Sequence, residues 1–163
     1  ANDPGISKVV DATEYVAAVP WAWLRAQGLA SVDDVRAHVA ARREGPLVVM
    51  RRVDGVGKKV DVGALLDVVA VDDGDDAVRA AGYVGDLLAL RFRTRVLPTG
   101  AAKAMEVVEA LFGPEAPARY IRTAMGRLRD GAIVSPMTLD ALRVVKLAPE
   151  PPDAPTTNTA PDA

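Results

Sequence analysis

The segment Leu87–Leu97 has the pattern that most restricts the fold of this chain. Leu88, Leu90, Phe92, Thr94 and Val96 occupy one set of alternating positions, and Arg91, Arg93 and Arg95 occupy the other. Successive side chains of a strand point to opposite faces of a sheet, so this segment predicts a strand with one buried and one solvated face. Sheets that leave one face to solvent are typically antiparallel. The pattern therefore favours an antiparallel sheet that helices cover on one side only.

Strands and helices alternate in the rest of the chain. Apolar and β-branched runs predict strands over 14–19, 47–53 and 119–125, and apolar stripes at helical spacing predict helices over 31–43 and 101–112. Ser31 has the character of an N-cap for the first helix, and Gly113-Pro114 ends the second. The order is β-α-β, an insert over about 54–85, then β-α-β. This is the element order of the ferredoxin-like split βαβ fold, and it predicts an α+β class.

Shorter signals complete the expected organisation. Asp54-Gly55 predicts a hairpin turn that leads into a partner strand over 58–62, and residues 131–134 and 138–145 predict a short strand and a helical turn. The acidic stretch 72–76 is interpreted as a solvated loop, because Tyr83 stands where a calcium loop needs its closing Glu. We expect one domain over 9–148, an irregular segment over 1–8 and a disordered tail rich in Pro, Thr and Ala over 149–163.

Composition removes several kinds of chemistry from this chain. It has no cysteine and one histidine, His38, which excludes disulfides, thiolate zinc sites, iron–sulfur clusters held by its own thiolates and sites that need two imidazoles. We therefore expect no cofactor and no metal in this chain. No apolar run approaches the ~20 residues that span a bilayer, so we expect no membrane contact and a cytoplasmic, bacterial protein.

No motif predicts catalysis. The segment 55–59 lacks the spacing and the hydroxyl of a phosphate-binding P-loop and is interpreted as a basic hairpin tip. His38 is interpreted as a surface residue. Trp21 and Trp23 suit core or interface packing, although they could also flank a ligand or a base. We expect no catalytic residues and no independent enzymatic activity.

The basic residues offer the candidate binding surface. Arg91, Arg93 and Arg95 are expected roughly 7 Å apart on one strand face, and Arg51 or Arg52 from a second strand would join them. Lys58 and Lys59 at the hairpin tip could contact a nucleic-acid backbone. Such a row could follow phosphates, bind a protein, or pair with Asp and Glu of neighbouring strands in solvent. The strand lacks stacking aromatic residues on its polar face, which lowers the case for sequence-specific RNA binding.

A set of short motifs in the order of the chain resembles a known family. They are Glu14-Tyr15-Val16, the segment 48–52, Gly57-Lys58-Lys59-Val60-Asp61-Val62, the segment 91–96, the helix end at 108–113 and the segment 119–122. Together, over about 12–125, they resemble the second half of the radical SAM-linked protein family. That family is a domain of unknown function encoded beside, or fused to, radical SAM enzymes. Lys58, Lys59 and Asp61 carry the most particular of these motifs.

The resemblance also has departures and implications. The Ser-His-Leu-Asp and Gly-Phe-Asn-Pro elements of the family's first half do not occur, and Gly63 stands where the family has an arginine. The chain thus resembles the C-terminal half alone. The resemblance implies an accessory module that docks onto a radical SAM iron–sulfur enzyme. The alternative is a module that presents RNA to such an enzyme for modification through the basic strand face. Since the chain has no cysteine, any radical chemistry would belong to the partner.

Overall fold

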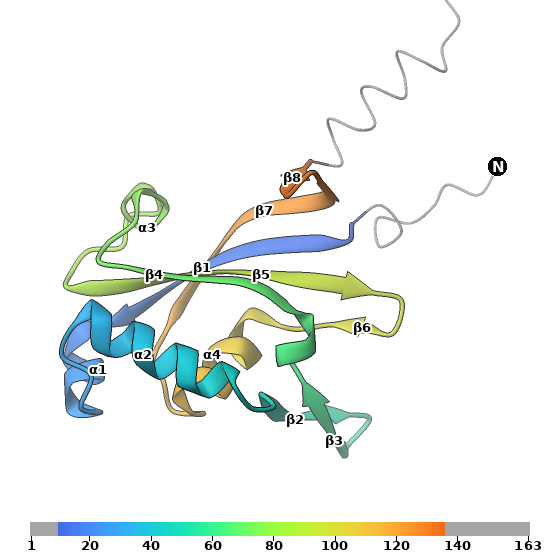
Figure 1. Ribbon diagram of the computed structural model, residues 1–163, viewed down its shortest axis with the longest axis horizontal. Helices are drawn as coiled ribbons and strands as arrows, with labels where there is room; N and C mark the ends of the chain where they lie inside the picture. The colour runs from blue at the N-terminus through green and yellow to red at the C-terminus, as the bar shows by residue number, and fades with distance from the viewer. Residues whose placement is uncertain (1–9, 136–163) are drawn as a thin grey trace, which may run out of the picture.

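The main sheet of the protein is antiparallel and strongly curled (Figure 1). The computed structural model describes residues 10–135, so the segments predicted over 1–8, 138–145 and 149–163 lie outside the described residues. The sheet has the order β4-β5-β1-β7-β8, and the short β6 pairs with β5. The bounds are β1 (Ala12–Pro20), β4 (Leu66–Asp72), β5 (Leu87–Leu97), β6 (Gly100–Ala101), β7 (Arg119–Arg129) and β8 (Ala132–Val134).

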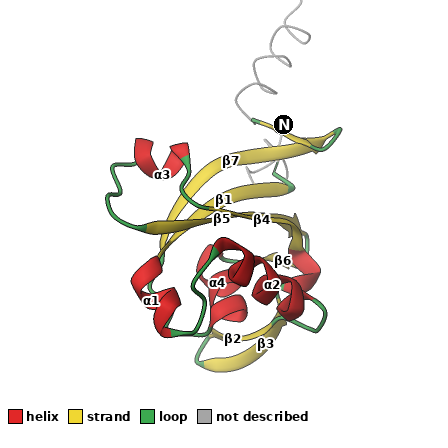
Figure 2. Ribbon diagram, turned by 60° about the vertical axis from the view of Figure 1, so that its left-hand side comes forward, coloured by secondary structure: helices red, strands yellow, loops and turns green. Residues whose placement is uncertain are grey.

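Three helices lie under one face of this sheet, and a separate hairpin lies beyond them (Figure 2). The helices are α1 (Trp21–Ala26), α2 (Val32–Arg43) and α4 (Ala104–Phe112). The hairpin consists of β2 (Val48–Val53) and β3 (Val56–Asp61), and a 3-10 helix over Gly63–Leu65 leads from it into β4. A short helix, α3 (Asp76–Ala80), lies on the opposite face of the sheet. These elements establish an α+β fold.

The predicted alternation of β5 is present in the structure. Leu88, Leu90 and Phe92 are fully buried and pack with Ala17 and Val19 of β1 against the helices. On the other face, β5 presents its three arginines, and a small second cluster lies under α3. That cluster is formed by Val16, Ala18, Val78 and Ala89. The sheet therefore has one face that is apolar apart from the buried pair Thr13 and Thr94, and one face that is apolar only where α3 covers it.

Helix α2 begins, and the β2–β3 hairpin turns, where the sequence predicts. The Ser31 hydroxyl accepts a hydrogen bond from the backbone N–H of Asp34, and the Asp34 carboxylate accepts one from the Ser31 N–H, which forms a capping box. Asp54 and Gly55 both have positive φ, as a two-residue hairpin turn requires. The sequence alone was sufficient to predict the helix cap and the hairpin turn, because each is formed by neighbouring residues.

The prediction that residues 47–53 belong to the main sheet is wrong. β2 pairs only with β3, and β4, which lies inside the expected insert, takes the place beside β5. The burial of the two segments gives the physical reason. β2 buries only Val49 of its six residues, whereas β4 buries Leu66 and Val71 against the helical layer. Arg51 and Arg52 place one cation on each face of β2, so neither face is apolar along its whole length and the strand gains less from joining this sheet.

Candidate interaction surface

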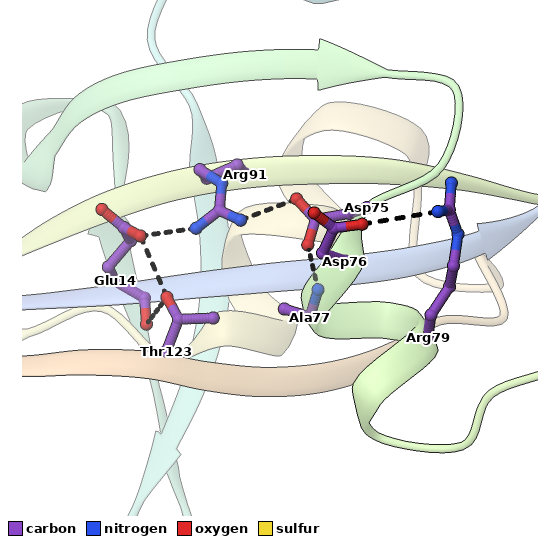
Figure 3. Close-up of polar contacts among 7 residues, drawn as sticks. All are labelled: Glu14, Asp75, Asp76, Ala77, Arg79, Arg91 and Thr123. Carbon is purple, nitrogen blue, oxygen red and sulfur yellow. Dashed lines mark hydrogen bonds and ion pairs between the residues drawn. The ribbon is translucent and has the colours of Figure 1, made fainter.

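The arginines of β5 lie on the open face of the sheet, and acidic groups surround them. Arg91 donates one hydrogen bond to Glu14 Oε1 of β1 and one to Asp75 Oδ2, each at 2.6 Å (Figure 3). The two carboxylates come from segments 77 and 16 residues away along the chain. Thr123 of β7 donates to the same Glu14 oxygen at 3.0 Å. Arg91 therefore connects β5, β1 and the start of α3.

The other two arginines of this row are also paired. Arg93 Nη1 donates to the carbonyl of Gly131 at 3.0 Å, and Arg93 Nη2 lies 3.6 Å from Glu14 Oε2. Arg95 Nε lies 3.8 Å from Asp67 Oδ2. Three guanidinium groups thus face the three carboxylates of Glu14, Asp67 and Asp75, and their formal charges cancel. The structure matches the alternative in which the row pairs with neighbouring acidic residues.

The acidic stretch 72–76 is more structured than the predicted solvated loop. The Asp75 side chain is only 10% exposed and accepts a hydrogen bond from Ala77 N at 2.7 Å, so it caps α3. Asp73 accepts a hydrogen bond from Trp21 Nε1 at 3.1 Å. The prediction of a solvated loop is therefore wrong for Asp75, whereas Asp73 is exposed as predicted. An Asp before an acidic first turn is an N-cap signal that could have revealed α3.

Opposing effects set the pKa values of the carboxylates around Arg91. Burial raises the pKa of Glu14, but the hydrogen bonds from Arg91 and Thr123 and the charges of Arg91 and Arg93 outweigh it, so the net pKa lies below the ordinary value. Burial likewise raises the pKa of Asp75, and hydrogen bonds from Arg91 and from Ala77 N outweigh it. Both side chains therefore stay ionised at lower pH than free carboxylates do.

We expect this network to make the fold acid-sensitive. Because Glu14 and Asp75 have lower pKa values in the folded than in the unfolded chain, their stabilisation is full above the unfolded pKa values of about 4. It is lost as pH falls through the lowered values. The free energy of unfolding, measured by urea titration between about pH 6 and pH 3, should fall toward acid pH, and Glu14→Gln should make that fall shallower. An equal slope for both proteins would contradict the assignment.

Arg51 does not join the arginine row, which corrects that prediction. It lies on β2, on the opposite side of the helical layer, and forms a two-point ion pair with Glu106 of α4. Nε lies 2.8 Å from Oε1 and Nη2 lies 2.6 Å from Oε2. Nη2 also donates to the carbonyl of Ala101 at 2.8 Å. Arg52 belongs to the same separate hairpin and is exposed, so it does not join the row either.

The contacts of Glu106 show that this pair is structural. Its side chain is 8% exposed and also accepts a hydrogen bond from Lys103 N at 2.9 Å. The hydrogen bonds from Arg51 lower the pKa of Glu106, burial opposes them, and the Lys103 N–H adds to the lowering. The same hydrogen bonds raise the pKa of Arg51. The pair attaches the hairpin to the start of α4.

The hairpin combines exposed apolar and basic side chains. Val48, Met50, Val53 and Val56 are 46%, 60%, 46% and 69% exposed, and Arg52, Lys58 and Lys59 are exposed beside them. We call these seven residues the hairpin surface. Within residues 10–135, none of the three cations forms an ion pair. The seven predicted basic residues thus fall into three groups. The hairpin brings together Arg52, Lys58 and Lys59, and the sheet keeps together Arg91, Arg93 and Arg95. Arg51 is separate from both groups.

Asp61 of the Lys58-Lys59-Asp61 motif holds the base of the hairpin. Its Oδ1 accepts hydrogen bonds from Leu47 N at 3.2 Å and from Gly63 N at 3.0 Å. A Cβ at position 63 would lie 3.1 Å from the same oxygen. In this fold Asp61 caps a turn, while the two lysines remain available to solvent. The motif therefore divides into a structural residue and two surface cations.

The aromatic and imidazole candidates are packing residues. Trp21 is buried in the core and Trp23 packs against it. His38 is half-buried, with Nε2 2.7 Å from the carbonyl of Leu111 and its ring stacked on Phe112, so the prediction of a surface histidine is wrong. In the described part of the chain, no group of three or more His, Asp or Glu could hold a metal, and no helix could span a membrane.

Sequence analysis missed the apolar part of the hairpin surface. The signal was present, because β2 and β3 together contain five valines and one methionine in a segment too short to bury two faces.

The resemblance to the radical SAM-linked family stays a prediction. Comparison with protein-family models, with curated proteins and with solved structures gave no match.

Proposed function

We propose that this chain is a non-catalytic accessory module that docks onto a protein partner through the hairpin surface. The observation that carries the proposal is the concentration of exposed apolar side chains there. Among residues 10–135, seven large hydrophobic residues are exposed, and four of them, Val48, Met50, Val53 and Val56, lie on this one hairpin. Val48 and Met50 lie on one face of the hairpin, and Val53 and Val56 lie on the other face next to the turn. Exposed apolar residues gathered among polar neighbours are typical of interaction sites.

The surroundings of the hairpin indicate the chemistry of the partner. Met105, 58% exposed, lies in the first turn of α4 next to Glu106, the residue that binds Arg51 of β2, and adds an exposed apolar side chain to the same end of the molecule. Arg52, Lys58 and Lys59 add three positive charges that no described acidic residue neutralises. An apolar patch with acidic side chains around it would complement both features. The resemblance supplies the identity we propose for that partner, a radical SAM iron–sulfur enzyme.

RNA binding through the β5 arginines receives less support. A phosphate backbone is attracted by uncompensated positive charge, and each arginine of this row already faces a carboxylate. Displacing those carboxylates would cost part of the attraction. We therefore place protein docking first and treat RNA binding as an outcome of the experiment below.

We also propose that the core of the fold is ferredoxin-like, with β4 as the second strand of the plait. Support comes from the order β7-β1-β5-β4 with antiparallel neighbours, and from α2 and α4, which follow β1 and β5 in the chain. In this interpretation the β2–β3 hairpin is an insertion between α2 and β4. An insertion that carries exposed apolar residues agrees with a specialised docking element on a common scaffold.

Co-expression with a radical SAM enzyme from the same genome, chosen from beside this gene where the resemblance implies one, tests the docking proposal. We expect the two proteins to purify together, and Met50→Asp to reduce the retained partner at least about tenfold, because it places a charge at the centre of an apolar contact. Val84→Asp is the matched control, since Val84 is 94% exposed and lies outside the hairpin. It should leave the retained partner unchanged.

Two outcomes would overturn the docking proposal. One is a wild-type chain that does not retain the full-length enzyme. The other is equal retention by Met50→Asp and wild type. A parallel titration with single-stranded RNA at about 50 mM salt tests the alternative. Binding of RNA that Arg93→Ala weakens, together with no retention of the enzyme, would assign the RNA function instead.

A further inference from the structure

The outer edge of β7 differs from the other edge of the main sheet. β8 pairs with β7 only over Arg127–Arg129, and within residues 10–135 no strand pairs with the outer side of Arg119–Gly126. A Cβ at Gly126 would overlap the carbonyl of Val134, so the glycine lets the chain leave the edge at this point. The backbone groups on the outer side of the remaining length of β7 are therefore open to pairing.

The opposite edge of the sheet is closed by a side chain. Arg36 of α2 donates two hydrogen bonds, from Nε and Nη2, to the carbonyl of Val71 in β4, at 3.3 and 3.0 Å. A side chain placed on an edge carbonyl prevents another strand from pairing there. Among the hydrogen bonds of the described residues, none closes the outer edge of β7 in this way. Of the two edges of the sheet, β7 therefore has the longer stretch without such a contact among the described residues, Arg119–Gly126.

The charge of β7 indicates what kind of strand it would accept. The strand contains four arginines and no acidic residue. Arg119 and Arg122 are exposed along the open part, and neither forms an ion pair within residues 10–135. Arg119 lies over the ring of Tyr83, 5.5 Å from its centre. The open edge is thus flanked by positive charge, which favours an extended segment that carries carboxylates.

A groove beside the first residues of β7 adds a second recognition feature. Its volume is about 580 Å³, and its lining includes Leu87, Pro117, Ala118 and Arg119. Peptides that add to a sheet edge gain affinity from backbone hydrogen bonds and specificity from pockets for their side chains. A segment paired along β7 would place the side chain of its terminal residue at this groove.

We propose that the outer edge of β7 binds an extended acidic segment of a partner protein by strand addition. The main sheet, which contains β7, and the β2–β3 hairpin lie on opposite sides of the helical layer (Figure 2). The two surfaces can therefore be occupied at the same time. The edge proposal does not depend on the docking proposal, since it uses other residues and another type of contact.

The test uses the full chain and an eight-residue peptide of alternating Glu and Val with blocked ends. Anisotropy of a dye on the peptide measures its affinity, and amide hydrogen exchange locates the contact. We expect slower exchange in β7 between Arg119 and Met125, and at least about fivefold weaker binding by Arg122→Glu, because the change replaces an attraction by a repulsion. Arg52→Glu, on the hairpin, is the matched control and should bind the peptide as the wild type does.

Control peptides separate strand addition from simple charge attraction. A peptide with Pro in place of Val keeps the carboxylates but loses the backbone N–H of every second residue and the freedom to form a regular strand, and it should bind more weakly than the Glu-Val peptide. No binding of the Glu-Val peptide, equal binding of the proline peptide, or equal weakening by Arg52→Glu would overturn the proposal. Slow exchange, before peptide is added, of the β7 amides that point away from β1 would also overturn it, because a second copy or another part of this chain would then occupy the edge.

Discussion

Replacement of Arg51 by Ala is expected to lower the free energy of unfolding by about 3 kcal/mol. The change removes both hydrogen bonds that Glu106 receives from the guanidinium, as well as the donor to the carbonyl of Ala101. Glu106 is left 8% exposed without an ion-pair partner, with only the weaker charge effect of Lys103 to offset its own. Breaking a buried pair in this way costs far more than removing a surface charge. Urea or thermal unfolding of the two proteins measures the difference.

The neighbouring residue supplies the control for this prediction. Arg52 lies on the same strand, is exposed, and forms no ion pair among the described residues, so Arg52→Ala should change stability by less than about 0.5 kcal/mol. The double variant Arg51→Met with Glu106→Leu should recover much of the loss, because it removes the buried charge together with its partner. Equal stabilities of Arg51→Ala and Arg52→Ala would contradict the structural role of the pair.

Replacement of Arg91 by Met is expected to cost about 2 kcal/mol, because it removes the shared partner of Glu14 and Asp75. The loss is smaller than for Arg51, since Arg91 keeps 34% of its side chain exposed and solvent screens the pair. The variant should also loosen α3, because Asp75 both caps that helix and binds Arg91. Faster amide exchange of α3 in the folded protein would report this local effect.

Arg95 offers the matched control in the same row. It is 52% exposed and its nearest carboxylate oxygen is 3.8 Å away, so Arg95→Met should change stability by less than about 0.5 kcal/mol and leave α3 unaffected. If Arg91→Met behaved like Arg95→Met, the row would be an ordinary solvated face. The neutralised network that argues against phosphate binding would then lose its support.

The sequence predicts the parts of the fold that depend on neighbouring residues. The alternation in Leu87–Leu97, the cap at Ser31 and the Asp54-Gly55 turn each reflect contacts within a few positions, and the structure contains all three. The assignment of strands to the sheet is different, because it depends on which apolar segment best covers the helices. Residues 47–53 and 66–72 compete for that place, and burial of Leu66 and Val71 decides it.

The candidate site was predictable to a similar extent. Alternation places the arginines of β5 on one face, but it does not reveal that Glu14 binds Arg91 from 77 positions away. The assignment of Arg51 failed for the same reason, since its partner Glu106 lies 55 positions along the chain. Burial of carboxylates beside guanidinium groups is a property of tertiary structure. The composition of the hairpin, with its valines and lysines, already contained the signal for the exposed hairpin surface.

Hydrogen exchange of the chain with and without the radical SAM enzyme that we propose as its partner is the most direct test of the central claim. That claim is that the hairpin surface, rather than the arginine row of β5, is the docking surface. We expect the amides of β2 and β3 to exchange more slowly in the complex, with those of β5 unchanged on binding. Slower exchange confined to β5 and the β1 segment around Glu14, with β2 and β3 unaffected, would contradict the claim and return the function to the arginine row.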